Sequence, residues 1–164
     1  MRRIVVCDTG PLLHLSEANA IYLLQLTGEV IIPPIVAKEF KQNAPDLKLP
    51  DWIQIKSLDE PYGKKALEWS KQVDAGEAAA IALTLQEQAE WLLSDDAKAR
   101  QFAESLGLEV HGSVGLLLWC VATRHIGGRD SASRLLDALA DSSLWISDRV
   151  LRQARQAIDT FFSE

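Results

Sequence analysis

The sequence predicts an α/β fold, a three-layer α/β/α sandwich built on a central parallel sheet of four to five strands. Two observations predict it. Short runs of β-branched and other apolar residues recur along the chain, and stretches with the helical spacing of apolar residues lie between them. Strands that are apolar throughout and alternate with helices are typical of a parallel sheet covered on both faces.

Five short apolar segments are expected to form the strands. They are residues 4–7, 30–32, 53–55, 91–93 and 108–110. The first segment ends at Asp8 and is followed by Thr9-Gly10-Pro11, which we interpret as a turn that leads the chain away from the sheet. A buried strand has no structural need for a carboxylate at its end, so Asp8 is the first candidate functional residue.

The segments between and after these strands show helical patterns. They are residues 12–26 (two short helices interrupted near Ala18-Asn19), 35–43, 63–72, 75–88, 96–106, 114–122, 131–140 and 148–162. Pro33-Pro34 suits a first helical turn, and Gly107 suits a helix end. Gly127-Gly128 marks a turn, and Ser147 is a plausible N-cap of the last helix.

Length and composition indicate an ordinary globular protein. With 164 residues, 48% of them hydrophobic, we expect one domain spanning residues 1–164. No apolar run reaches the roughly 18 residues that span a bilayer, and Asp8 interrupts the basic and apolar start too early for a signal peptide. Cys7 and Cys120 lack a ligand-like spacing, so we expect two free thiols in a cytoplasmic protein with no membrane partner.

The net charge of −6 argues against a broad basic face that coats nucleic acid. It does not exclude a nuclease. The carboxylates of an active site make the total negative, while a local basic rim still contacts phosphates.

Carboxylates follow two of the expected strands, at the edge where open parallel sheets bind their ligands. Asp8 follows the first strand, and Asp95 and Asp96 follow the strand at residues 91–93. Asp96 also stands where a helix begins, so an N-cap is the competing explanation for it.

Three further carboxylates lie on helices close to this edge. Glu39 is near the apolar face of the helix after the second strand, although a solvated helix position would also explain it. Asp74 and Glu77 open the alanine-rich helix and share one face. An N-cap at Asp74 with Glu77 as its capping-box partner is the structural alternative.

Carboxylates that converge on one point repel each other unless cations neutralise them. Hard divalent ions such as Mg²⁺ and Mn²⁺ prefer oxygen ligands, and they promote phosphoryl chemistry. The residues alone therefore indicate a candidate acidic metal site.

Four segments in this order resemble the PIN-domain superfamily: VVCDTGPLLHL, IIPPIVAKEF, DAGEAAAIALT and LLSDDAKARQFAESLGLEVHGSVGLLL. The chain is most similar to small prokaryotic PIN-like proteins related to VapC-type toxin ribonucleases. The resemblance extends to about Asp148. Each motif is weak alone, and the ordered set is fairly specific.

The resemblance implies an α/β/α fold and an enzyme that hydrolyses RNA phosphodiesters with Mg²⁺ or Mn²⁺. Matched position by position, the implied catalytic and metal-binding residues are Asp8, Glu39, Glu77 and Asp95, with Asp96 as an adjacent ligand candidate and Asp74 as a rival of Glu77. Thr9 matches the small hydroxyl residue that follows the first aspartate, which implies a position next to the metal ligands and not a ligand role of its own. Two departures from the better-known toxins, the glutamate at 77 and the Asp95-Asp96 pair, leave the ligand set open.

Basic and histidine residues add less specific expectations. Lys98, Arg100, Arg124 and Arg129 are candidates for phosphate contacts, although solvated surface charges would explain each of them. The histidines His14, His111 and His125 have no spacing that suggests a zinc site or a triad. We expect His14, on an apolar helix, to be a packing residue.

The resemblance also implies partners: RNA, a cognate antitoxin protein that blocks the acidic pocket, and a second copy in a homodimer. Trp119, Phe161 and Phe162 would then pack either in the core or on that second subunit. The main alternative is a weakly active or inactive PIN-like module that acts by binding a partner protein. A haloacid-dehalogenase-like phosphatase ranks low, because Gly10 stands where that chemistry needs a second aspartate.

Overall fold

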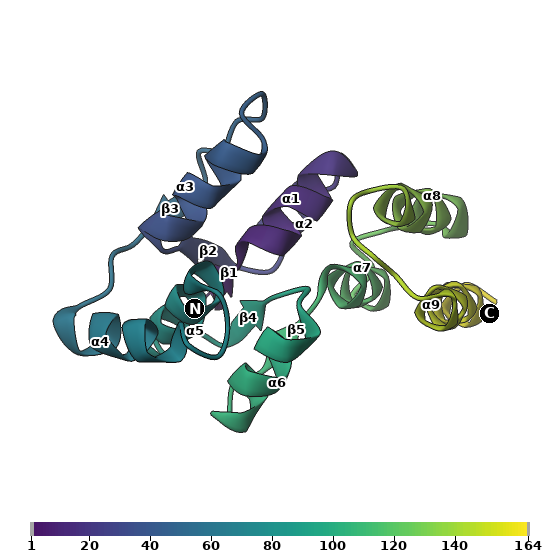
Figure 1. Ribbon diagram of the computed structural model, residues 1–164. Helices are drawn as coiled ribbons and strands as arrows, with labels where there is room; N and C mark the ends of the chain where they lie inside the picture. Colours follow the sequence, from purple (N-terminus) through teal and green to yellow (C-terminus); the bar gives the residue numbers. More distant parts are fainter. Residues whose placement is uncertain (1, 164) are drawn as a thin grey trace.

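The computed structural model describes residues 2–163. The strands are β1 (Ile4–Cys7), β2 (Glu29–Ile32), β3 (Ile53–Ile55), β4 (Trp91–Leu93) and β5 (Val110–His111). The helices are α1 (Thr9–Glu17), α2 (Tyr22–Gln25), α3 (Pro34–Asn43), α4 (Glu60–Trp69), α5 (Ala75–Gln86), α6 (Ala97–Ser105), α7 (Ser113–Ala122), α8 (Arg129–Ala140) and α9 (Asp148–Phe161). Figure 1 shows their arrangement.

The strands form one parallel sheet in the order β3-β2-β1-β4-β5. Val5 on the central strand pairs with Val30 on one side and with Trp91 on the other. Because the chain leaves β1 first toward β2 and later returns to its other side with β4, the sheet has a switch point between β1 and β4. In open parallel sheets, a crevice outside the carboxyl ends of the strands at this point is the usual ligand site.

Alternate residues of the strands face two separate apolar layers, as the predicted three-layer sandwich requires. Val5 and Cys7 on β1 pack with residues of α1, α2, α3, α7, α8 and α9. Val6, between them, packs with residues of α5 and α6, and Trp69 of α4 borders this second cluster. Figure 1 shows α1 and α3 on one side of the sheet and α4, α5 and α6 on the other. The predicted fold class is confirmed.

The expected turn at Thr9-Gly10-Pro11 is wrong, since these residues form the first turn of α1. The side chain of Asp8 accepts a hydrogen bond from the backbone N–H of Thr9, so the helix begins directly after the strand. Pro11 is tolerated there because the first helical N–H groups have no partner inside the helix.

Other boundaries differ by a few residues. Helices α4 and α8 begin at Glu60 and Arg129, earlier than their apolar patterns suggested, and the last strand is displaced toward His111. The break between the first two helices is confirmed, and Asn19 within it has a φ of 55°. The predicted N-cap is also confirmed, because the Ser147 hydroxyl accepts from Val150 N at 3.1 Å.

Three aromatic residues were expected to pack either in the core or on a second subunit, and the structure supports packing in the core. Trp119, Phe161 and Phe162 are half-buried and pack against the larger apolar cluster. Cys7 and Cys120 are free and buried. Within residues 2–163, no helix combines the length and the apolar character needed to cross a bilayer.

Candidate active site in an acidic cleft

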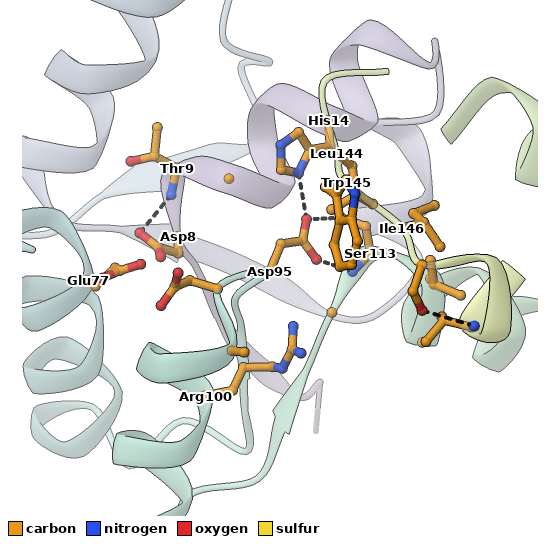
Figure 2. A pocket seen from close by; sticks show the side chains of 18 of the residues that line it. Asp8, Thr9, His14, Glu77, Asp95, Arg100, Ser113, Leu144, Trp145 and Ile146 are labelled. Atoms are coloured by element: carbon orange, nitrogen blue, oxygen red, sulfur yellow. Dashed lines mark hydrogen bonds and ion pairs between the residues drawn. The ribbon is translucent and has the colours of Figure 1, made fainter. Parts of the chain in front are cut away.

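A cleft of about 800 Å³ opens beyond the carboxyl ends of β1 and β4 (Figure 2). All six carboxylates expected from the sequence line it: Asp8, Glu39, Asp74, Glu77, Asp95 and Asp96. Thr9 and Arg100 line the same space. The segment from Leu144 to Ser147 and the first turn of α9 contribute apolar residues to the lining.

Asp8 lies at the bottom of this site and is 6% exposed. Its Oδ1 accepts from Thr9 N at 2.8 Å, and its Oδ2 has only a long contact of 3.4 Å with the Ser94 hydroxyl. Burial raises the pKa of Asp8 to about 8, and the charges of Glu77, Asp74 and Glu39 add to the rise. The hydrogen bond from Thr9 N opposes the shift, but it does not cancel the cost of burying the charge.

Glu39 reaches the cleft from α3, half-buried, with its Oε1 3.5 Å from the Thr9 hydroxyl. This contact places the Thr9 hydroxyl beside one of the candidate ligands. Gly76 on α5 makes room for the glutamate, because a Cβ at that position would lie 1.9 Å from Glu39 Oε1. Burial and the charge of Asp74 raise the pKa of Glu39.

Asp74 and Glu77 form the capping box that the sequence offered as an alternative. Asp74 Oδ1 accepts from Glu77 N at 2.8 Å, and Glu77 Oε1 accepts from Asp74 N at 3.1 Å. The box engages one oxygen of each carboxylate, so capping and a role in the cleft are compatible. Burial raises the pKa of Glu77 to about 7, helped by the charges of Asp74, Asp96 and Glu39.

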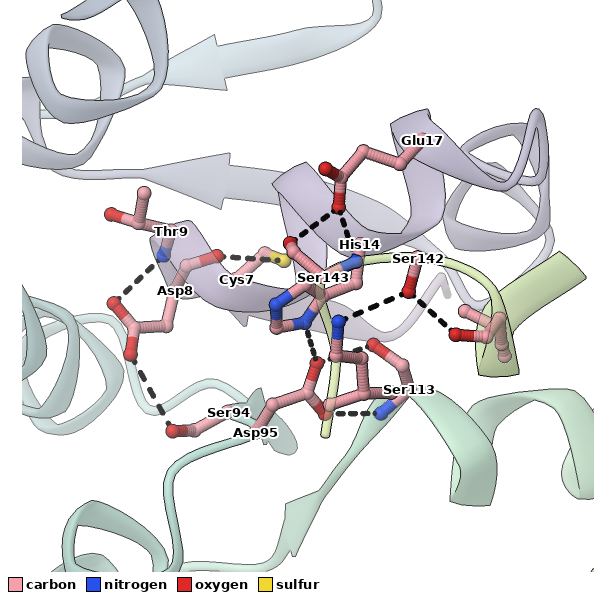
Figure 3. A network of polar contacts seen from close by, with 12 residues as sticks. Cys7, Asp8, Thr9, His14, Glu17, Ser94, Asp95, Ser113, Ser142 and Ser143 are labelled. Atoms are coloured by element: carbon pink, nitrogen blue, oxygen red, sulfur yellow. Dashed lines mark hydrogen bonds and ion pairs between the residues drawn. The ribbon is translucent and has the colours of Figure 1, made fainter. Parts of the chain in front are cut away.

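Asp95 differs from the other acids, because both of its oxygens are engaged (Figure 3). Oδ1 accepts from Ser113 N at 2.6 Å, and Oδ2 accepts from the Ser113 hydroxyl at 2.6 Å and lies 2.7 Å from His14 Nδ1. The side chain is only 7% exposed. It joins the end of β4 to α1 and to the start of α7, which indicates a structural role.

Asp96 is the more available member of the acidic pair. It is exposed, and its Oδ2 caps α6 by accepting from Ala99 N at 2.8 Å. Its charge contributes to the raised pKa of Glu77, which places the two groups within electrostatic reach. Of the pair that the sequence left open, Asp96 therefore fits the ligand role better than Asp95.

The acidic set fits a hard divalent cation by its donor chemistry, because Asp8, Glu39 and Glu77 offer carboxylate oxygens that form no ion pair with a base among residues 2–163. Crowding and burial hold the pKa values of these three groups above their usual range. Across the described part of the chain, however, no three carboxylate, imidazole or thiol groups already stand close enough to ligate one ion together. Ions such as Mg²⁺ keep several waters in protein sites, so a looser acidic cluster is compatible with one.

The four basic candidates separate into two groups. Arg100 lines the cleft and donates from Nη1 to Ser94 O at 3.3 Å, and Lys98 is exposed on the same helix. Arg124 and Arg129 lie outside the cleft lining. Arg124 is placed 6.0 Å from the Phe161 ring centre, and Arg129 pairs with Asp159 of α9.

His14, Ser113 and Trp145 also line the cleft, and the sequence did not mark them as site residues. The expectation that His14 is only a packing residue is wrong, because its imidazole pairs with Asp95 from 81 positions away in the sequence. Ser113 was not singled out, although a small hydroxyl residue at the start of an apolar helix suggests an N-terminal turn. Trp145 follows no periodic pattern that would have marked it.

A family model described as a PIN domain matches residues 4–160 of the chain. No curated protein matches the sequence.

Proposed function

The chain belongs to the PIN-domain family, whose members are generally nucleases, and from this premise we propose that it is a ribonuclease that requires Mg²⁺ or Mn²⁺. The observation that supports the proposal most is that Asp8, Glu39 and Glu77 line one cleft, where burial and neighbouring carboxylates raise the pKa of each. Three buried or half-buried carboxylates with no paired base are costly unless a cation joins them. They stand at the sheet edge where parallel folds bind their ligands.

Asp8, Glu39 and Glu77 would hold the ion, directly or through water, with Asp96 at the periphery. A divalent ion in such a site offsets charge on phosphate oxygens and acidifies a water. Thr9 would orient Glu39, and Arg100, which lines the cleft, would contact a phosphate oxygen of a bound strand. Asp95 was predicted to be a catalytic and metal-binding residue, but both of its oxygens contact His14 or Ser113, and we propose that it holds the walls of the cleft instead of the ion.

Cleavage of a 5′-labelled single-stranded RNA tests this proposal, with a DNA of the same sequence as comparison. We expect RNA cleavage with Mg²⁺ or Mn²⁺, none with EDTA, and loss of cleavage in Asp8→Asn and Glu77→Gln. Asp51→Asn is the matched control, because this carboxylate is 92% exposed and lies outside the cleft. Wild-type protein that cleaves no RNA with either ion, or cleavage that survives in Asp8→Asn, contradicts the proposal.

A PIN-like module that binds a partner protein and is weakly active or inactive is the second candidate. It is favoured by one observation, namely that no ready ligand set for a single ion stands among residues 2–163. Under this alternative, Asp8→Asn leaves partner binding intact, and no ion restores cleavage.

We further propose that the nuclease acts as the toxin of a toxin–antitoxin pair in the cytoplasm, where it forms a homodimer. The support is the resemblance to small toxin ribonucleases. Expression of the chain alone is expected to arrest growth, and co-expression of a neighbouring small reading frame is expected to relieve it. Arrest must disappear with Asp8→Asn, and sedimentation must give twice the mass of one chain. Normal growth on expression of the active enzyme contradicts the toxin role and leaves the nuclease proposal standing.

A further inference from the structure

Trp145 is an exposed indole in the lining of the acidic cleft. It is 83% exposed, more than any other large hydrophobic residue among those that the structure describes. Leu144 and Ile146 line the cleft beside it (Figure 2). Val150 also belongs to the lining. A tryptophan buries more apolar area than most side chains, so its exposure forgoes a large stabilisation.

The segment that presents Trp145 is anchored on both sides. Leu144 and Ile146 pack against the larger apolar cluster, which leaves the indole between them directed outward. Before this stretch, Ser143 donates from its N and its hydroxyl to Glu17 Oε1 at 3.2 and 2.6 Å (Figure 3). After it, Ser147 caps α9.

Further contacts hold the same segment. Leu144 N donates to the Ser142 hydroxyl at 3.2 Å, and that hydroxyl donates in turn to Leu139 O at 2.6 Å. Trp145 is therefore a side chain on a fixed backbone, and its position beside the acids is part of the fold.

We propose that Trp145 is the stacking platform for one unpaired base of a single-stranded nucleic acid whose phosphate lies over the acidic cluster. The inference rests on the proposed function and adds a subsite to it. Proteins that hold single strands combine contacts to the backbone with aromatic side chains on which bases stack. Trp145, Arg100 and the acids all line one cleft of about 800 Å³, within the size range of small-ligand sites.

A nucleobase fits this platform better than a protein partner does. A stable protein interface buries on the order of 800 Å² on each side. Trp145 and Val150 are the exposed large hydrophobic residues that line the cleft, and Leu144 and Ile146 beside them are half-buried. Such a small apolar area next to carboxylates suits one planar, uncharged ring.

The first test measures binding of fluorescein-labelled eight-nucleotide RNA and DNA probes of one sequence by fluorescence anisotropy, in Ca²⁺. Trp145→Leu is expected to weaken binding about 5- to 100-fold, whereas Trp145→Phe retains most of the affinity. Leu67→Ala is the matched control, because Leu67 is 74% exposed on α4 and lies outside the cleft. Circular dichroism checks that each variant is folded.

The RNA and DNA probes show whether Trp145 recognises the base alone or also depends on the ribose. A loss shared by RNA and DNA supports stacking on the base alone, and a loss confined to RNA supports stacking that also depends on the ribose. RNA probes with one abasic nucleotide at successive positions locate the base. One of them must bind wild type and Trp145→Leu equally.

Wild-type affinity in Trp145→Leu overturns the inference and leaves a partner protein as the occupant of Trp145. The inference is also overturned if Trp145→Leu loses the same affinity for every abasic probe, or if the wild type binds neither the RNA nor the DNA probe. Cleavage is measured separately. If binding depends on Trp145 but no RNA is cleaved, the result contradicts the proposed nuclease and supports the stacking platform. If RNA is cleaved but binding does not depend on Trp145, the result contradicts only the stacking platform.

Discussion

Gly76→Ala separates the function of the cleft from the stability of the fold. The added Cβ would lie 1.9 Å from Glu39 Oε1, and ordinary contact begins at 3.4 Å, so the carboxylate must retreat by about 1.5 Å. The obstructing group is the end of a half-buried, flexible side chain, so its movement costs little folding free energy. Gly76 is the second residue of α5, and alanine forms helices more readily than glycine, so the change is not expected to weaken the helix.

The expected result is a folded protein, at least as stable as the wild type, that binds Mn²⁺ about 10-fold more weakly. Residues that orient metal ligands typically contribute 10- to 100-fold in affinity. Isothermal titration calorimetry measures the affinity, and urea denaturation measures the free energy of unfolding. Gly63→Ala is the matched control, because it is a helical glycine in α4 whose added Cβ meets nothing within 4 Å.

A double-mutant cycle identifies the route of the effect. In a Glu39→Ala background the obstructed carboxylate is gone, so Gly76→Ala is expected to cause no further loss of Mn²⁺ affinity. If Gly76→Ala binds Mn²⁺ with wild-type affinity, the position of the Glu39 carboxylate does not matter for the ion. An additive loss in the double variant also contradicts the prediction, because the glycine would then act independently of Glu39.

The other predictions concern Asp8, the acidic pair and a helix cap. Asp8 has its usual pKa of 3.8 raised to about 8, so the metal-free wild type is expected to lose stability as pH rises from about 4 to 8. Asp8→Asn removes this pH dependence. In urea denaturation, its free energy of unfolding should exceed that of the wild type by up to about 4 kcal/mol at pH 7 and should equal it near pH 4. Asp95→Asn should lower the free energy of unfolding by about 2–3 kcal/mol, and with it Tm, without abolishing Mn²⁺ binding. Asp96→Asn should weaken Mn²⁺ binding at constant Tm, because asparagine still caps α6. The reverse pattern would contradict a structural Asp95 and a metal-binding Asp96. Ser147→Ala should lower Tm in a thermal melt by about 2–4 °C, and an unchanged Tm would show that the cap adds nothing.

The sequence predicted the sheet well because buried strands and their exits are local features. The apolar run before Asp8 and the Leu-Leu before Ser94 mark strands, and the parallel arrangement places both exits at one edge. The capping box of Asp74 and Glu77 was also predictable, since its two members are three residues apart.

The different contacts of Asp95 and Asp96 could not be predicted from neighbouring residues. They depend on His14 and Ser113, which are distant in sequence and meet Asp95 only in the folded chain. The first helix was misjudged for another reason. Gly10-Pro11 is a common turn signal, but a cap at Asp8 makes the same residues a helix start.

The most direct test of the acidic metal site is to compare Mn²⁺ binding by the wild type and by Asp8→Asn. Calorimetry measures it in two buffers of different ionisation enthalpy. Circular dichroism confirms that both proteins are folded. We expect the wild type to bind Mn²⁺ and to release protons at pH 7, because Asp8 and Glu77 have pKa values of about 8 and 7 before the ion binds. Folded Asp8→Asn must bind far more weakly. A wild type that binds no Mn²⁺ contradicts the acidic metal site and leaves the partner-binding module as the better explanation of this cleft.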